Sequence, residues 1–285
     1  MSEIENIAKE MIAKGKGILA ADESTGTMTK RLASVKVEST SENRLKFRET
    51  LFSAEGMKNY IGGVILYDET IKQKTSSGKT VPELIKSFGS IPGIKVDTGA
   101  KKLAGSPEEK VTEGLDGLRS RLEEYAELGA SFTKWRGVIT IGQGIPTSYC
   151  IEANAHALAR FAALSQEAGL VPIVEPEVLM DGDHSIDACF EANEAALREV
   201  FEHLARQRVV LEGILLKPSM VLSGSNASKR AGPEEVAEKT ISCFKRVVPA
   251  SVPGIVFLSG GQTDEEATIN LNAINKQASS VGAPW

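Results

Sequence analysis

The sequence predicts an α/β protein, a (β/α)8 barrel of the TIM type, and three observations carry this prediction. Seven short apolar runs recur along the 285 residues, each continuous as in strands buried within a parallel sheet. Helix-like stretches lie between most of the runs, as the crossovers of a parallel sheet require. Every run ends in polar residues, and such barrels keep their active sites at the carboxyl ends of their strands. The pattern therefore favours an enzyme.

Strands and polar residues follow each other in a regular order. The apolar runs cover 17–21, 63–67, 91–94, 131–133, 171–174, 214–216 and 255–258. In the same order they lead into Asp22, Asp68 with Glu69, Lys95 with Asp97, Lys134 with Arg136, Glu175 with Glu177, Lys217, and Ser259-Gly260-Gly261. Because the carboxyl ends of parallel strands meet at one edge, we expect these residues to gather there.

Apolar residues at helical spacing predict the covering helices. We expect helices over 41–54, 112–128, 147–168, 186–207, 233–247 and 264–276. The charged first fourteen residues predict another helix and not a signal peptide. Residues 98–111 and 222–232 are polar and rich in Gly, Ser and Lys, which predicts loops.

The number of strand–helix units predicts an incomplete barrel. Seven units can be recognised, whereas a closed barrel needs eight, and the sequence ends at Pro284-Trp285 where an eighth strand should begin. No change of composition marks a linker. We therefore expect a single barrel domain over residues 1–285, truncated at its C-terminal end.

Composition excludes several classes of partner. A net charge of −5 without a basic stripe excludes nucleic acid, and an anionic substrate would need a local cluster of lysines. No apolar run approaches the length of about 18 residues that a membrane span needs. The three cysteines, Cys150, Cys189 and Cys243, are widely spaced, which favours reduced thiols and a cytoplasmic location.

Lys217 is the strongest candidate for a nucleophile. Desolvation at the end of a buried strand, and a second cation nearby, favour the neutral amine that can attack a carbonyl and form a Schiff base. Lys95 and Lys134 also end strands, so three lysines are expected near one cavity. The alternative is a lysine that reaches the barrel rim or pairs with a carboxylate.

Carboxylates at strand ends are candidates for acid–base chemistry. Glu175 and Glu177 lie two residues apart, so both should project to the same side of their strand. A structural ion-pair network is the alternative for this pair. Asp22 is the third candidate, whereas Asp68 and Glu69 could equally begin the next helix.

Two segments have the composition of phosphate sites. Ser259-Gly260-Gly261 offers glycine amides and a hydroxyl, and Ser24 to Thr27 with Arg31 offers hydroxyls and a guanidinium at a helix start. Two anion sites predict a bisphosphate. A metal is disfavoured, because His156, His184 and His203 do not form a ligand pattern, and no cofactor is expected.

These segments together closely resemble the class I, Schiff-base fructose-1,6-bisphosphate aldolases. The motifs occur in family order at 15–26, 93–97, 134–136, 174–177, 216–218 and 258–262. The resemblance implies a metal-independent, cytoplasmic lyase of glycolysis and gluconeogenesis that cleaves fructose 1,6-bisphosphate, and by analogy a homo-oligomer.

The resemblance also implies a role for each residue. Lys217 would form the Schiff base, Glu175 would accept its proton, Asp22 would act at the C4 hydroxyl beside Lys134, and Glu177 would support them. Lys95, Arg31, Ser24 and Thr27 would hold one phosphate, Ser259, Gly260 and Gly261 the other, with Arg136 also binding substrate.

The resemblance stops at the C-terminal end. The family continues with an eighth strand whose arginine holds the phosphate next to the ketone, and this sequence shows no such segment. The alternative function is therefore a non-catalytic scaffold that binds phosphate ligands. Another Schiff-base aldolase or a transaldolase on the same barrel is a third possibility.

Overall fold

A computed structural model describes residues 2–285, and its internal contacts divide the chain into two compact units. The first unit holds the residues up to Val96 together with Gly117–Lys134 and Leu164–Pro172. The second unit holds Asp97–Asp116, Trp135–Ala163 and Ile173–Trp285. Each unit is described separately. That both belong to one barrel domain stays a prediction.

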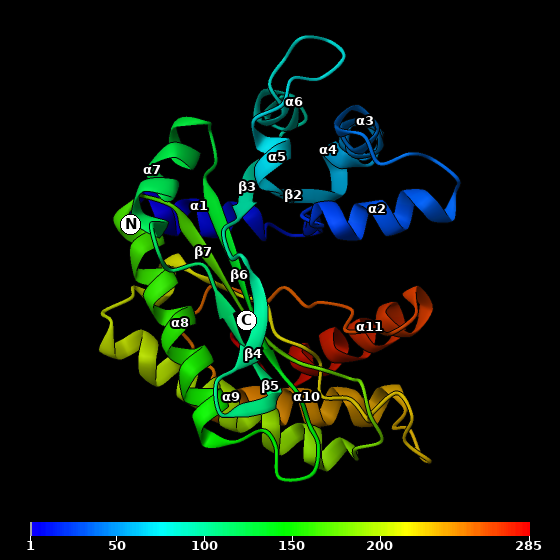
Figure 1. The fold of residues 1–285 in the computed structure, drawn as a ribbon. Coiled ribbons are helices and arrows are strands. Elements are labelled where there is room, and N and C mark those ends of the chain that lie inside the picture. Colours follow the sequence, from blue (N-terminus) through cyan, green and yellow to red (C-terminus); the bar gives the residue numbers. More distant parts are fainter. Residues whose placement is uncertain (1) are drawn as a thin grey trace. The chain divides into compact units, whose positions relative to one another are not determined.

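Parallel strands form the centre of the first unit (Figure 1). They are β1 (Gly17–Ala20), β2 (Ile61–Leu66), β3 (Ile91–Lys95) and the start of β6 (Phe132–Ile139). Gly63 of β2 lies opposite Ile91 of β3, and Gly93 lies opposite Phe132 of β6. The Val171 N–H, at the start of β7 (Val171–Val178), donates to the Ser131 carbonyl at 3.1 Å. The side chains of Val64, Ile65 and Leu66 are fully buried, as expected in a parallel sheet.

Seven helices belong to the first unit, among its described residues. They are α1 (Glu3–Met11), α2 (Thr25–Ser34), α3 (Ser41–Phe52), α4 (Met57–Tyr60), α5 (Asp68–Ile71), α6 (Val81–Ser87) and α7 (Leu118–Glu127). Side chains determine where several of them begin: Ser24 accepts from the Thr27 N–H, and Thr80 forms a reciprocal capping box with Glu83.

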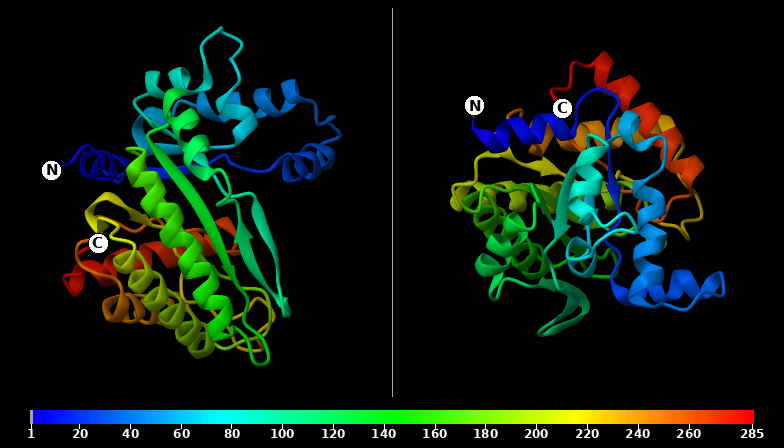
Figure 2. Two further views of the ribbon diagram at one scale, coloured as in Figure 1. Left: turned by 60° about the vertical axis from the view of Figure 1, so that its left-hand side comes forward. Right: turned by 90° about the horizontal axis from the view of Figure 1, so that it is seen from above.

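The second unit contains an antiparallel hairpin, the remainder of β6 and β7, and long helices (Figure 2). Its other elements are β4 (Gly99–Leu103), β5 (Ser106–Glu113), β8 (Leu215–Leu216), the 3-10 turn η1 (Leu211–Gly213), α9 (Ile186–Arg206), α10 (Pro233–Val247) and α11 (Asp264–Ser280). Most of α8 (Ser148–Glu167) also lies here. Helix α10 packs against both α9 and α11. The strand order over the chain is β1-β2-β3-β6-β7-β8.

Two strands run further than predicted. Strands β6 and β7 continue to Ile139 and Val178, so four candidate site residues lie inside strands and not beyond their ends: Lys134, Arg136, Glu175 and Glu177. Most other predicted strands and helices are confirmed, but three further predictions are wrong. Residues 98–111, expected to be a loop, form the β4–β5 hairpin, and the predicted helix over 112–128 begins only at Leu118. The run over 255–258 forms one isolated bridge, between Ile255 and Leu216. The Val256 N–H donates to the Leu216 carbonyl at 2.9 Å and the Leu258 N–H to the Pro218 carbonyl at 3.4 Å, but Pro218 has no N–H to donate, so the ladder is incomplete.

Candidate active site

In the first unit, Asp22 lies immediately beyond β1 and contacts two lysines. Its Oδ2 is 2.8 Å from the Lys134 Nζ, and its main-chain carbonyl accepts a hydrogen bond of 2.8 Å from the Lys95 Nζ. Lys134 is buried, with 5% of its surface exposed. The Lys95 ammonium also lies 5.1 Å from the centre of the Tyr67 ring, which favours a cation. We call Asp22, Lys95 and Lys134 the Asp22 cluster.

The predicted phosphate segment of the first unit surrounds the start of α2. The Ser24 side chain caps this helix, and its Oγ lies 3.2 Å from the Thr27 Oγ1. Arg31 donates to the Glu23 carboxylate at 2.5 Å, and 57% of the Arg31 side chain is exposed. An anion arriving from solvent can therefore reach the guanidinium, and bare N–H groups at a helix start favour anions.

In the second unit, Lys217 and Glu175 form a buried ion pair. The Lys217 Nζ donates to Glu175 Oε1 at 2.6 Å. Lys217 follows β8, and its N–H donates to the Val174 carbonyl of β7, so the two strands place the ammonium beside the carboxylate. Glu175 is 3% and Lys217 9% exposed. A lysine at such a place has a proton acceptor within direct reach. We call these two residues the Lys217 pair.

Glu177, two residues along β7, pairs with Arg136 instead. Arg136 Nε donates to Glu177 Oε2, and the Arg136 N–H donates to Asp97 Oδ2 at 3.4 Å. Burial by itself would lower the pKa of Arg136, but the hydrogen bond and charge of Glu177, with the charges of Glu175 and Asp97, outweigh it and raise the pKa above its ordinary value. The guanidinium therefore remains a cation.

The Ser259-Gly260-Gly261 turn is held in a glycine-specific conformation. Gly260 and Gly261 have φ angles of 63° and 91°, which residues with a side chain rarely adopt. The Gln262 side chain donates to the Ser259 carbonyl at 2.7 Å and accepts from Asn270 of α11 at 2.6 Å. The turn is thus fixed to a helix, with a hydroxyl and glycine amides at its tip.

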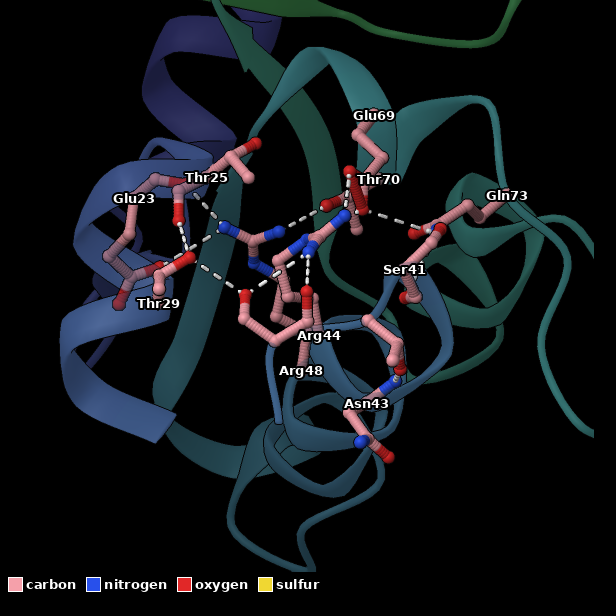
Figure 3. Close-up of polar contacts among 12 residues, drawn as sticks. Glu23, Thr25, Thr29, Ser41, Asn43, Arg44, Arg48, Glu69, Thr70 and Gln73 are labelled. Atoms are coloured by element: carbon pink, nitrogen blue, oxygen red, sulfur yellow. Dashed lines mark hydrogen bonds and ion pairs between the residues drawn. The ribbon is translucent and has the colours of Figure 1, made fainter. Parts of the chain in front are cut away.

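Arg48 and Arg44 of α3 are polar residues that the strand-end rule did not select (Figure 3). Arg48 donates to the Thr70 Oγ1 at 2.7 Å and to the Glu23 carbonyl at 2.5 Å. Arg44 makes a two-point contact with Glu69, at 3.0 and 2.7 Å. Two arginines four residues apart on one helical face were the only sequence signal for this network.

Asp68 and Glu69, which the sequence left as either functional residues or the beginning of a helix, lie at the beginning of α5. Both lie in the first turn of α5, where acidic side chains are favoured. Asp68 pairs with Lys72 at 2.9 Å and accepts from the Tyr125 hydroxyl at 2.8 Å. These carboxylates therefore have structural partners on neighbouring helices.

The described residues contain neither a metal-binding group nor a membrane-spanning helix. Among residues 2–285, no group of three or more His, Cys, Asp and Glu side chains is arranged to hold a metal ion. No helix in this range is long and apolar enough to cross a membrane. Cys150, Cys189 and Cys243 are free and buried.

A parallel sheet with a buried lysine–carboxylate pair beside its strands is typical of an α/β enzyme. The sequence model of the family "Fructose-bisphosphate aldolase class-I" matches residues 3–285. The chain belongs to this family, and the predicted family is confirmed.

Relatives from distant organisms are also named as fructose-bisphosphate aldolases. A "Probable fructose-bisphosphate aldolase class 1" of Xanthomonas campestris is 56% identical over 285 residues, which are 100% of this chain and 84% of that protein. Human "Fructose-bisphosphate aldolase B" is 51% identical over 274 residues, or 96% of this chain and 75% of that protein. "Fructose-bisphosphate aldolase 4, cytosolic" of Arabidopsis thaliana is 51% identical over 271 residues, or 95% of this chain and 68% of that protein.

A solved structure shows the same fold. Fructose-bisphosphate aldolase from Plasmodium falciparum, in complex with TRAP and a small-molecule inhibitor, superposes with a TM-score of 0.95. It is 45% identical, and the match covers 99% of this chain and 81% of that one. An α/β fold with a parallel sheet is therefore confirmed.

The comparisons do not support the predicted truncation before an eighth strand–helix unit. The family model matches residues 3–285, and the chain aligns with 84% of the Xanthomonas relative. The alternative of a non-catalytic scaffold depended on that loss, and it is not favoured.

Proposed function

We propose that the chain is a carbon–carbon lyase that reversibly cleaves fructose 1,6-bisphosphate into dihydroxyacetone phosphate and glyceraldehyde 3-phosphate. The reaction proceeds through a Schiff base on Lys217 and serves glycolysis and gluconeogenesis. The observation that carries the proposal is the Lys217 pair, a 2.6 Å contact between a buried amine just beyond β8 and a buried carboxylate of β7. Membership of the class I aldolase family supports the same chemistry.

The Lys217 pair supplies the covalent step. Glu175 accepts the proton that Lys217 donates in the hydrogen bond, which leaves a neutral amine to attack the C2 ketone. Loss of water then gives a protonated iminium, which withdraws electrons from the neighbouring carbon–carbon bond. Glu177 acts indirectly, because it holds the Arg136 guanidinium in place.

The Asp22 cluster supplies the acid–base step. Asp22 removes the proton of the C4 hydroxyl, the C3–C4 bond breaks, and glyceraldehyde 3-phosphate leaves. The Lys134 ammonium at 2.8 Å balances the charge of the carboxylate. The remaining enamine is protonated at carbon, and hydrolysis of the Schiff base releases dihydroxyacetone phosphate and regenerates Lys217.

Two groups of residues hold the phosphates. Lys95, Arg31, Ser24 and Thr27 bind one of them, and Ser259, Gly260 and Gly261 bind the other. Arg136 also binds the substrate. The exposed Arg31 side chain and the glycine turn both offer hydrogen-bond donors, which suits phosphate oxygens.

The cellular setting follows from the same family membership. We place the enzyme in the cytoplasm, which the relative named as cytosolic in Arabidopsis thaliana supports. A sugar phosphate is its substrate, and metal ions and cofactors have no part in the reaction. A homo-oligomer is proposed by analogy with the family.

Borohydride trapping tests the proposal. Reduction in the presence of dihydroxyacetone phosphate should attach the ligand to Lys217, as peptide mass spectrometry would show. Lys217→Met should abolish both the adduct and cleavage, whereas Lys245→Met, a change of an exposed lysine on α10, should preserve both. A label on another lysine in the wild-type protein would refute the assignment. An adduct on Lys217 without cleavage of fructose 1,6-bisphosphate would favour another Schiff-base aldolase.

A further inference from the structure

Arg48 is one of the most deeply buried charged residues of the described chain. It is 1% exposed, and burial lowers the pKa of its guanidinium while Glu23 opposes that effect. Removing a guanidinium from water is unfavourable, and an apolar residue of similar volume is often as stable at such a position. A stability role alone therefore gives little reason for an arginine at this place.

The contacts of Arg48 converge on the segment that carries Asp22. Its Nη2 donates to the Glu23 main-chain carbonyl at 2.5 Å and lies 3.5 Å from Glu23 Oε2. Its Nη1 donates to Thr70 Oγ1, which is fully buried in α5. Figure 3 shows this guanidinium between Glu23 and Thr70. Arg48 thus connects two helices to the residue that follows Asp22.

The segment around Asp22 connects strand β1 to helix α2. Strand β1 ends at Ala20, the Ala21 N–H makes the last sheet hydrogen bond, to Ile65, and α2 begins at Thr25. Between these points, two consecutive carbonyls accept hydrogen bonds from cations. Asp22 accepts from Lys95, and Glu23 accepts from Arg48.

We propose that Arg48 is a positioning residue for Asp22, which fixes the backbone at Glu23 so that the Asp22 carboxylate keeps its place beside Lys134. The consequence for catalysis rests on the proposed function, in which Asp22 removes the C4 hydroxyl proton. A displacement of about 1 Å in such a group can reduce the rate about a hundredfold. In the proposed reaction, Schiff-base formation uses Lys217 and Glu175 and does not use Asp22, so it should not depend on Arg48.

Arg48→Met is the test, and Arg44→Met is its matched control. Both changes remove a guanidinium from the same helix, but the hydrogen bonds of Arg44 go to Glu69 and Ser39 and not to Glu23. Arg48→Met should lower kcat for cleavage about 10- to 100-fold with a smaller change in KM, and leave borohydride trapping with dihydroxyacetone phosphate within about twofold of wild type. Arg44→Met should change neither the kinetic constants for cleavage nor the amount of trapped adduct.

Two further measurements separate positioning from general damage. Arg48→Ala should regain part of its kcat in millimolar guanidinium, which can occupy the vacated space, and Arg44→Ala should not respond. Arg48→Lys keeps a charge but cannot reach Thr70 and Glu23 with one planar fork, so its kcat should lie between those of wild type and Arg48→Met. If Arg48→Met does not fold, these two variants carry the test.

Hydrogen exchange of the peptide around Asp22 reports on the geometry without any assay of activity. Arg48 variants should exchange faster over residues 17–27 than Arg44→Met. Unchanged exchange there, or cleavage and trapping that fall in parallel, would overturn the positioning role. If the wild-type protein is neither trapped nor active, the proposed function fails, and the exchange result still decides whether Arg48 holds the segment.

Discussion

Glu109 of β5 gives a stability prediction that can be worked out from its contacts. Its carboxylate is 1% exposed and accepts three short hydrogen bonds, from the Ser106 hydroxyl at 2.7 Å, the Thr147 N–H at 2.7 Å and the Thr147 hydroxyl at 2.6 Å. The Thr147 hydroxyl in turn accepts from the Cys150 N–H. Glu109 therefore ties the hairpin to the beginning of α8, where a negative charge is favoured.

Glu109→Gln preserves the shape of the side chain but removes its charge. Hydrogen bonds to a charged group contribute about 1.5–3 kcal/mol each, and those between neutral groups about 0.5–1.5 kcal/mol. Over three bonds, we expect a loss of about 2–4 kcal/mol in the free energy of unfolding at neutral pH. For a chain of this size that corresponds to a fall in Tm of roughly 5–10 °C.

The loss of stability in Glu109→Gln should depend on pH. Burial by itself would raise the pKa of Glu109, but the hydrogen bonds from Ser106 and Thr147 outweigh it and hold the pKa below its ordinary value. The stabilisation is therefore fully present above the unfolded-state pKa of about 4.3, and it disappears as the pH falls through the lower folded-state pKa. The difference in Tm between wild type and Glu109→Gln should shrink over that window.

Scanning calorimetry between neutral pH and pH 3 measures this difference. Glu108→Gln is the matched control, because it makes the same change of charge on the adjacent, exposed residue. It should shift Tm very little. An equal shift for both variants, or a Glu109→Gln shift that does not vary with pH, would refute the reasoning.

Two further predictions concern packing and thiols. In Gly93→Ala, the new methyl group would lie 2.4 Å from the Phe132 ring, so Tm should fall by an amount that corresponds to about 1–3 kcal/mol. Phe132→Leu in the same chain should restore part of this loss. Simple additivity of the two changes would contradict this account. Burial raises the pKa of Cys150 and Cys189 to about 11 and that of Cys243 to about 12. A disulfide reagent at pH 8 should therefore label these thiols only after unfolding. Rapid labelling of the native protein would show that the thiols are not buried.

The sequence was most informative where a charged residue directly follows a run of apolar residues that is expected to be buried. A lysine after Leu215-Leu216 or a glutamate after Ile173-Val174 is unusual enough to attract notice, and the structure gives both side chains a partner. Their roles stay predictions. Lys217 follows β8 as the strand rule expects, whereas Glu175 lies inside β7, which continues to Val178.

The β4–β5 hairpin could not be predicted because its residues lack a clear period. Lys, Glu and Gly dominate, and burial is confined to a few positions such as Leu103, Glu109 and Thr112. Strand pairing, and not residue type, determines this element. Arg48 was missed for a related reason, because its partners are separated from it by 22 and 25 residues and only the fold brings them together.

The proposed site residues share an electrostatic arrangement within each unit. Lys134 pairs with Asp22 and Arg31 with Glu23, while Lys217 pairs with Glu175 and Arg136 with Glu177. A paired cation can be buried at much lower cost than an isolated one, so the free protein can keep lysines at its strand ends.

The two kinds of pair then differ in how they respond to substrate. In the proposed reaction, proton transfer within the buried Lys217 pair replaces an ion pair by a neutral amine and a neutral acid. In the proposed reaction, a phosphate replaces the Glu23 carboxylate at the exposed Arg31 side chain and leaves Glu23 to Arg48. Burial thus suits the first pair to covalent chemistry, and exposure suits the second to exchange of anions.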